Sequence, residues 1–189
     1  MPARRRRGGA LLGALALGIA VAAGIGAIRG SDTADLTIDS GPARTRVPGV
    51  AAAGSVAPPF DLAALHGKTR VNLAALRGKP VIVNFWASYC GACRAEFPVL
   101  AKIAAEHPQV AVVGITYKDI PSDSRQFARK HHATWSLAKG GDGDAAGRAY
   151  GIRAIPQTFF IDRHGVIRAR AFGLPSTAAL NAVVSRIEK

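Results

Sequence analysis

The clearest pattern along the chain is an unbroken hydrophobic and β-branched run over residues 81–86, directly after Gly78-Lys79-Pro80. Such a run is typical of a central strand that is buried on both faces. Over residues 93–107, apolar side chains then recur at helical spacing with charged residues between them. The two patterns predict a strand, a short turn and a helix in direct succession.

Shorter patterns predict the remaining elements. A second buried strand is expected over residues 110–116, and a second helix over 122–132 with Ser122 as a plausible capping residue. The other expected elements are short strands at 60–65, 70–73 and 135–137, a loop at 140–144, a short helix at 145–150, a hairpin of 158–161 with 166–172, and a closing helix at 176–188. This order predicts an α/β fold, with a central mixed sheet flanked by helices on both faces.

The N-terminal residues 1–30 have a different character. Four arginines, Arg4 to Arg7, precede an uncharged apolar run that ends at Ile28. As a helix this run would span about 31 Å, close to the ~30 Å hydrocarbon thickness of a bilayer. It predicts a single-pass anchor in the cell membrane, with a signal peptide cleaved after Ala20-Val21-Ala22 as the alternative. The arginines favour the cytoplasmic side, so the rest of the chain is expected outside the cytoplasm, either anchored or secreted.

Residues 31–57 are rich in Gly, Pro, Ala, Ser, Thr and Asp, which predicts a flexible linker. The alternation Leu36-Thr37-Ile38 is compatible with an extra strand, but we favour the linker. One folded domain is then expected over residues 58–189. The formal net charge is +13, which favours acidic partners or anionic membrane surfaces. Nucleic acid is not expected as a partner, because the basic residues are scattered and accompany no recognisable nucleic-acid module.

The chain has two cysteines, Cys90 and Cys93, separated by two residues. A structural zinc site would need a second cysteine pair or suitably spaced histidines, and the sequence offers neither. A disulfide that closes so short a loop would restrain little of the unfolded chain. A redox-active dithiol is favoured, because the pair lies between a predicted strand and helix and in an exported part of the chain. We expect no metal and no cofactor other than this pair.

The predicted helix gives the two thiols different roles. Cys90 should lie just before the helix and Cys93 in its first turn, where free backbone N–H groups and the helix dipole favour a thiolate. Such placement can lower a thiol pKa from about 8.5 to between about 3.5 and 7.5. Cys90 is the expected nucleophile that forms a mixed disulfide with a substrate, and Cys93 the more buried thiol that resolves it.

Residues 84–98, NFWASYCGACRAEFP, resemble the active-site segment of thioredoxin-fold proteins. They look most like the TlpA/ResA/DsbE family of membrane-tethered thiol-disulfide oxidoreductases. The resemblance extends over residues 57–189 and includes further matching segments at 57–60, 76–80, 155–156 and 160–165. It implies a thioredoxin-like fold with an N-terminal β-hairpin and a central helix-strand insertion over 122–137.

The resemblance also assigns roles to residues near the cysteines. Pro156, after Ile155, matches the family's cis-proline, which lies beside the dithiol and leaves neighbouring backbone free to pair with a substrate. Glu96 matches an acidic residue thought to tune the thiols; its alternative is an ordinary solvated helix residue. Asn84 stands where cytoplasmic thioredoxin has a buried aspartate, which leaves Glu96 as the nearest candidate proton acceptor in sequence.

Two aromatic residues complete the candidate substrate-binding set. Trp86 either lines the site or belongs to the core. Tyr89 replaces the tryptophan that commonly precedes the first cysteine, and Gly91-Ala92 lacks the proline of many relatives. These departures leave the redox potential open.

The resemblance implies a reductant of specific extracytoplasmic protein disulfides, including those of apocytochrome c, recharged by a membrane thiol carrier of the CcdA/DsbD type. Apart from the resemblance, we expect a monomer. A DsbE-like oxidant that introduces disulfides into exported proteins is the first alternative. A peroxidase is a second, although no T-x-x-C peroxidatic pattern occurs. A copper-binding assembly factor is a third, although the distant histidine pattern common at such sites is missing.

Overall fold

The computed structural model describes residues 36–37, 51–141 and 144–189. The predicted anchor or signal peptide at 1–30 lies outside the described residues, as does most of the predicted linker. Within the described part of the chain, no helix is both long and apolar enough to cross a membrane.

The centre of the fold is a mixed sheet of six strands in the order β1-β8-β7-β4-β5-β6. Strands β4, β5 and β6 are parallel, whereas β7, β8 and β1 continue the sheet in antiparallel pairs. The strands are β1 Leu36–Thr37, β4 Val81–Trp86, β5 Ala111–Thr116, β6 Ser136–Ala138, β7 Gln157–Ile161 and β8 Ile167–Phe172. All six residues of β4 are buried, which confirms the predicted central strand.

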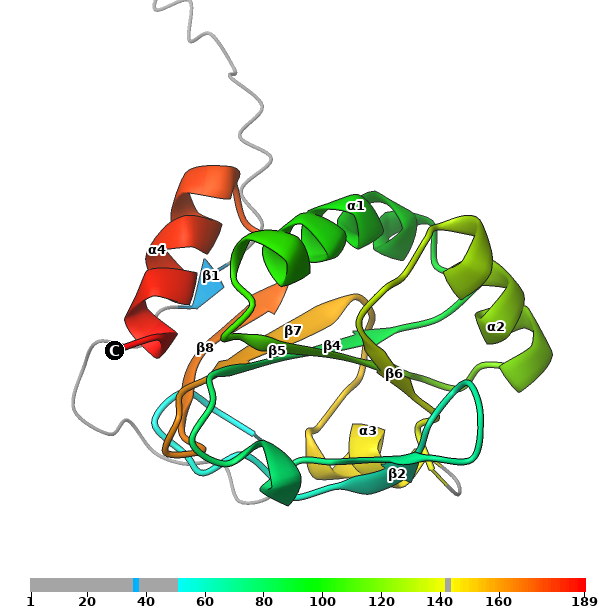
Figure 1. The fold of residues 1–189 in the computed structure, drawn as a ribbon, viewed down its shortest axis with the longest axis horizontal. Helices are drawn as coiled ribbons and strands as arrows, with labels where there is room; N and C mark the ends of the chain where they lie inside the picture. Colours follow the sequence, from blue (N-terminus) through cyan, green and yellow to red (C-terminus); the bar gives the residue numbers. More distant parts are fainter. Residues whose placement is uncertain (1–35, 38–50, 142–143) are drawn as a thin grey trace, which may run out of the picture. The chain divides into compact units, whose positions relative to one another are not determined.

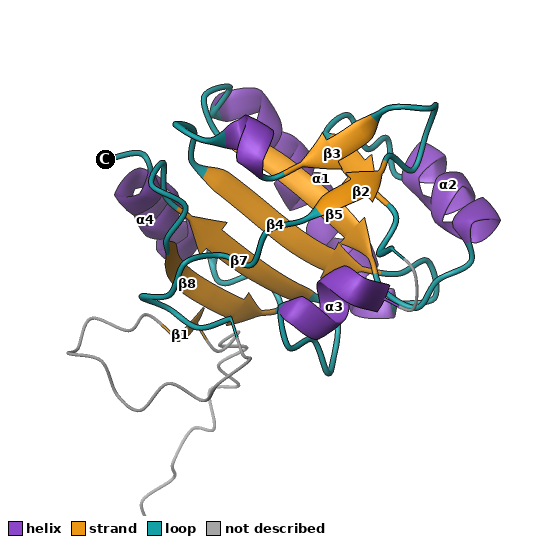
Figure 2. Ribbon diagram, turned by 90° about the horizontal axis from the view of Figure 1, so that it is seen from below, coloured by secondary structure: helices purple, strands orange, loops and turns teal. Residues whose placement is uncertain are grey.

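Helices cover one face of this sheet, and a hairpin and a short helix cover the other (Figures 1 and 2). The helices are α1 Gly91–Glu106, α2 Pro121–Lys130, α3 Ala145–Ala149 and α4 Thr177–Ile187. The alternation of side chains along β4 divides the core: Ile82 packs with α1 and α4, whereas Val83 and Phe85 pack with the α3 side. Both faces of the central strand are therefore covered, as the sequence predicts.

The hairpin consists of β2 Asp61–Ala63 and β3 Arg70–Asn72, followed by the 3₁₀ turn η1 Ala74–Leu76. It confirms the predicted N-terminal β-hairpin. Helix α2 and strand β6, which pairs in parallel with β5, form the predicted helix-strand insertion. The fold class inferred from the sequence is thus confirmed.

Residues 51–57, which the sequence analysis placed in the linker, pack against the folded domain. Ala51 and Ala57 are buried in the core, and Val56 forms a bridge with Val166. Strand β1 also falls within the predicted linker, where the strand was the less favoured alternative, and it pairs with β8. Hydrogen bonding to an existing sheet edge orders these segments, although their small residues show no hydrophobic period of their own.

The start of α2 differs from the prediction. The helix begins at Pro121, and the N-cap residue Ile120 makes no side-chain capping bond. Ser122 is not the cap, because proline at the first helical position has no N–H to satisfy and its fixed φ suits a helix start. The neighbouring Asp119 accepts the Ile120 N–H at 2.9 Å and also binds a different loop, as described below.

Candidate active site

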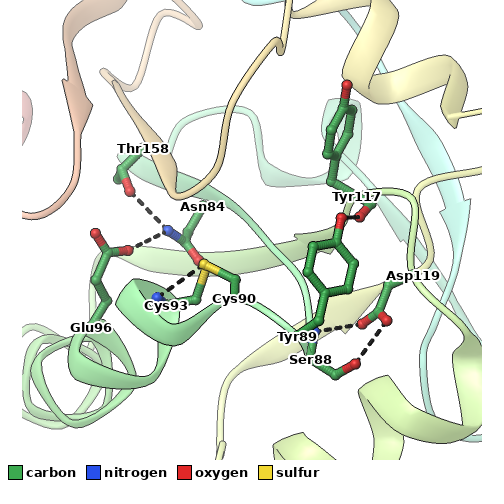
Figure 3. The surroundings of a disulfide bond; sticks show 9 residues. All are labelled: Asn84, Ser88, Tyr89, Cys90, Cys93, Glu96, Tyr117, Asp119 and Thr158. Carbon is green, nitrogen blue, oxygen red and sulfur yellow. Dashed lines mark hydrogen bonds between the residues drawn. A yellow bond between two sulfur atoms is a disulfide. The ribbon is translucent and has the colours of Figure 1, made fainter.

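Cys90 and Cys93 form a disulfide at the N-terminus of α1 (Figure 3), with a Cα–Cα distance of 5.3 Å. Cys90 is the N-cap residue of the helix, and its Sγ accepts a hydrogen bond from the backbone N–H of Cys93 at 3.1 Å. When the pair is reduced, this N–H and the helix dipole stabilise a thiolate on Cys90.

The turn between β4 and α1 sets the difference in exposure of the two sulfurs. It is closed by a hydrogen bond from the N–H of Cys90 to the Ala87 carbonyl at 3.2 Å. Cys90 is 9% exposed, whereas Cys93 is 0% exposed. A substrate sulfur can therefore approach Cys90 and not Cys93, which agrees with the nucleophile and resolving roles predicted for them.

A buried hydrogen-bonded group lies beside the disulfide on α1, β4 and β7. The side-chain amide of Asn84 donates to Glu96 Oε2 at 3.0 Å and to Thr158 Oγ1 at 2.9 Å. Asn84 and Thr158 face each other across the β4–β7 pair. Figure 3 shows this group on the Cys93 side of the site. Thr158 was not recognised in the sequence, because its role depends on strand register.

Glu96 is 4% exposed, so the alternative of a solvated helix residue does not apply. Burial raises the pKa of its carboxyl from 4.5 to about 7, although the Asn84 amide and the Leu174 backbone act in the opposite direction. Glu96 lies three residues after Cys93, about one turn along the same helix. A carboxyl with this pKa can accept a proton from a thiol and return it near neutral pH.

The predicted proline also lies at the site. The Ile155–Pro156 peptide bond is cis, and Pro156 is buried. Ile155 is half-buried and packs against the cluster that contains both cysteines. The structure thus brings Ile155, Cys90 and Cys93 together, although they are far apart in sequence.

Trp86 is fully buried and belongs to the core rather than to the exposed surface of the site. Its ring centroid is 4.9 Å from that of Phe97 and 5.4 Å from that of Phe127. A Cβ added at Gly114 on β5 would lie 3.0 Å from Trp86 Nε1, so glycine provides the space for the indole. Trp86 therefore packs in the buried cluster that contains both cysteines. Of the two roles considered for it, the structure gives it the role of a core residue.

Tyr89, in contrast, is 65% exposed directly before Cys90. Its hydroxyl lies 3.5 Å from the backbone oxygen of Tyr117, in the loop after β5. This placement suits the predicted contact of Tyr89 with a substrate, which stays a prediction.

Asp119 is a residue that the sequence analysis missed. Its carboxylate accepts hydrogen bonds from the Ser88 backbone N–H at 2.7 Å, the Ser88 hydroxyl at 2.8 Å and the Ser124 hydroxyl at 2.6 Å. It thereby connects the turn between β4 and α1, residues 87–90, to the loop between β5 and α2 (Figure 3). We call residues 87–90 the dithiol turn. The predicted topology could have indicated this contact. Ser88 follows β4 and Asp119 follows β5, and the carboxyl ends of neighbouring parallel strands meet at the same edge of a sheet.

Among the described residues, no group of three or more His, Cys, Asp or Glu side chains is arranged to hold a metal ion. The expectation that the protein needs no metal or further cofactor stays a prediction.

Comparison with known proteins places this geometry in a family. Residues 53–170 match the AhpC/TSA family. The chain belongs to this family.

The chain also resembles proteins named for disulfide exchange. It is 38% identical to the thiol:disulfide interchange protein DsbE of Pseudomonas fluorescens biotype C, over 64% of this chain and 67% of that protein. It is 33% identical to the thiol:disulfide interchange protein HelX of Rhodobacter capsulatus, over 65% of this chain and 69% of that protein.

A solved structure supports the same assignment. The crystal structure of a secreted Mycobacterium tuberculosis disulfide oxidoreductase homologous to E. coli DsbE has 25% sequence identity and a TM-score of 0.59, covering 67% of this chain and 95% of that one. Together with the Cys90–Cys93 pair, these matches confirm the DsbE-like resemblance and the thioredoxin-like fold. The protein is a thiol-disulfide oxidoreductase.

Proposed function

We propose that this enzyme acts outside the cytoplasm and reduces disulfides in specific exported proteins, apocytochrome c among them. The observation that carries the proposal is the pairing of an accessible Cys90 with a buried Cys93 that has a carboxyl of pKa about 7 one helical turn away. The reducing direction is supported by the resemblance to the TlpA/ResA/DsbE family. Electrons would come from a membrane thiol carrier of the CcdA/DsbD type.

The extracytoplasmic location is supported by the arginine cluster and apolar run at the start of the chain. It is also supported by the similarity to a secreted M. tuberculosis oxidoreductase. We further propose that the enzyme is a monomer, is anchored by its N-terminal segment, and uses no cofactor besides its own disulfide.

The residues give a balanced exchange reaction. The Cys90 thiolate attacks one sulfur of the substrate disulfide, so that an enzyme–substrate disulfide forms and the other substrate sulfur leaves as a thiolate, which takes up a proton. Cys93 then loses its proton to the Glu96 carboxylate and attacks Cys90 Sγ. This step forms the Cys90–Cys93 disulfide and breaks the bond between Cys90 and the substrate. The second substrate sulfur leaves as a thiolate and takes up the proton held by Glu96, so the substrate is released as a dithiol. Two electrons and two protons from the carrier restore the reduced enzyme.

Cys93→Ser tests the assignment of the two thiols. Without the resolving thiol, the enzyme–substrate disulfide on Cys90 should persist, and mass spectrometry after non-reducing electrophoresis would identify the trapped substrate. Cys90→Ser is the matched control and should trap nothing. Trapping by Cys90→Ser alone would reverse the two roles.

The redox potential tests the direction of the reaction. Dithiol proteins span about −120 to −270 mV, and that difference corresponds to about 7 kcal/mol for two electrons. We expect equilibration against glutathione or dithiothreitol to place this enzyme toward the reducing end. A potential near −120 mV, with rapid oxidation of reduced substrates, would contradict the reducing function.

A further inference from the structure

A basic groove lies beside the dithiol turn. It is lined by Tyr117, Lys118, Asp144, Arg148, Ile152 and Arg153 and has a volume of about 540 Å³. The lining comes from the loop after β5, from helix α3 and from the segment that leads to Pro156. It contains three cations and one carboxylate, so the groove carries a net positive charge.

The cations of the groove have no ion-pair partner in the part of the chain that the structure describes. Within residues 51–141 and 144–189, no carboxylate forms an ion pair with Lys118, Arg148 or Arg153. Asp144 Oδ1 accepts the backbone N–H of Lys118 at 3.0 Å, so this carboxylate is partly occupied. Lys118 Nζ lies 5.1 Å from the centre of the Tyr117 ring, which fixes one ammonium at the groove.

Two segments connect the groove to the surroundings of Cys90. Tyr89, which precedes Cys90, contacts the backbone of Tyr117 through its hydroxyl. Partial burial raises the pKa of the Tyr89 phenol, Asp119 and Asp144 raise it further, and Lys118 lowers it, so these charges lie within electrostatic range of the dithiol turn. On the other side, Arg153 is three residues before the cis-proline.

We propose that this groove binds an acidic stretch of the substrate protein, a few residues away from the disulfide that reaches Cys90. The proposal rests on the proposed function, since it names the class of disulfide substrate. A substrate segment bound across Cys90 would lie near Tyr89 or the cis-proline segment. The groove begins at Tyr117, which Tyr89 contacts, and at Arg153, three residues before Pro156. Carboxylates in the segment meet arginines that can bind them with two parallel hydrogen bonds. Without Arg4 to Arg7, which are expected on the cytoplasmic side, the chain keeps a formal charge of +9 (13 minus 4), and this charge attracts acidic partners over longer distances.

The experiment compares two disulfide-bonded peptides that differ only in carrying Glu or Gln residues next to their cysteines. The full-length enzyme is assayed in both directions, reduced enzyme with disulfide peptide and oxidised enzyme with dithiol peptide, so that at least one direction proceeds. We expect the acidic peptide to react about fivefold faster at low salt, as two screened surface ion pairs would give, and the preference to shrink at high salt. The double variant Arg148→Glu/Arg153→Glu should abolish or invert this preference.

The matched control is Arg163→Glu/Lys189→Glu, which changes the net charge equally at exposed positions outside the groove. It should keep both the preference and the wild-type redox potential. Equal rates for both peptides, or a preference that survives in Arg148→Glu/Arg153→Glu, would contradict the proposal that the groove binds an acidic stretch of the substrate. Loss of binding to phosphatidylglycerol vesicles by that variant, with the peptide preference unchanged, would instead assign the groove to a membrane surface. Failure of the reduced enzyme to reduce the Gln peptide, while the oxidised enzyme oxidises it, would contradict the proposed function alone.

Discussion

Glu96 connects the protonation of a single carboxyl to folding and, in the proposed reaction, to catalysis. Its pKa is about 7 in the folded protein, against 4.5 for an unperturbed carboxyl, mainly because burial disfavours the charged form. The folded state therefore binds this proton more tightly than the unfolded state does. The corresponding stability is complete below about pH 4.5 and is lost as the pH rises through about 7.

Glu96→Gln should remove this pH dependence. Between pH 5 and 8 the free energy of unfolding of the wild type should fall relative to that of the variant, by about 3 kcal/mol. Chemical denaturation at several pH values measures the difference. The variant should also resolve mixed disulfides about 100-fold more slowly at pH 7, because Cys93 loses its proton acceptor.

Glu106→Gln is a suitable control, since Glu106 is exposed at the end of the same helix and, among the described residues, pairs with Lys102 alone, at 3.9 Å. It should follow the wild type in both measurements. If Glu96→Gln kept the wild-type pH dependence of stability, Glu96 would not be the group that titrates near neutral pH.

At this scale the sequence predicted the chemistry better than the environment of each side chain. Cys90 and Cys93 were predictable, because the spacing and the strand–helix setting define a dithiol at a helix start. The burial of Glu96 was not, because a glutamate at a helical position is usually solvated and only the packing of Asn84 and Leu174 against it decides otherwise. Trp86 likewise remained undecided until its partners across α1 and α2 were known.

At the scale of elements, the active site depends on two loops held together by Asp119. One is the dithiol turn that contains Ser88, and the other leads from β5 into α2, where Ser124 lies. A carboxylate that accepts several hydrogen bonds within protein is a strong restraint on both loops. Asp119 thus acts as a positioning residue for Cys90.

Asp119→Ala should loosen the dithiol turn. It leaves the Ser88 N–H without its acceptor, and we expect a loss of about 2 kcal/mol in the free energy of unfolding. Displacement of Cys90 should also lower the rate of disulfide exchange about tenfold. Denaturant titration and single-turnover kinetics measure the two effects.

Asp123→Ala provides the comparison. Asp123 is exposed on α2, and within the described ranges the one side chain that donates a hydrogen bond to it is that of the adjacent Ser122. An equal loss of exchange rate in both variants would argue against a specific positioning role for Asp119.

Periodicity predicted the helices and hairpins of this region correctly in kind. It could not predict the start of α2 or the Asp119 contact, which depend on Pro121 and on the juxtaposition of two parallel strands.

At the scale of the whole molecule, residues 51–57 are bound to an edge of the folded domain, whereas their composition predicted a flexible linker. The N–H of Gly54 donates to Ile167 at 2.8 Å, and Ile167 and Ala57 donate to Ser55 and Gly165 at 2.9 Å. Small residues give no periodic signal, so the sequence could not separate this segment from a linker. Backbone hydrogen bonds, rather than large apolar side chains, fix it in place.

A truncated chain that begins at residue 58 should therefore be less stable than one that begins at residue 51. Loss of three backbone hydrogen bonds predicts a decrease of about 3 kcal/mol, or about 10 °C in Tm. Calorimetry on the two chains measures the difference. Equal Tm values would show that residues 51–57 contribute nothing to the stability of the domain.

The aromatic cluster under the disulfide has an optical consequence. The chain has two tryptophans; Trp86 lies in the same buried cluster as Cys90 and Cys93, and Trp135 packs against it. Both indoles also contact the ring of Phe97. An excited indole readily donates an electron to a nearby disulfide, which quenches its emission, whereas a dithiol is a poorer acceptor. The protein thus contains its own fluorophores for following electron flow, and each turnover can be observed without a label.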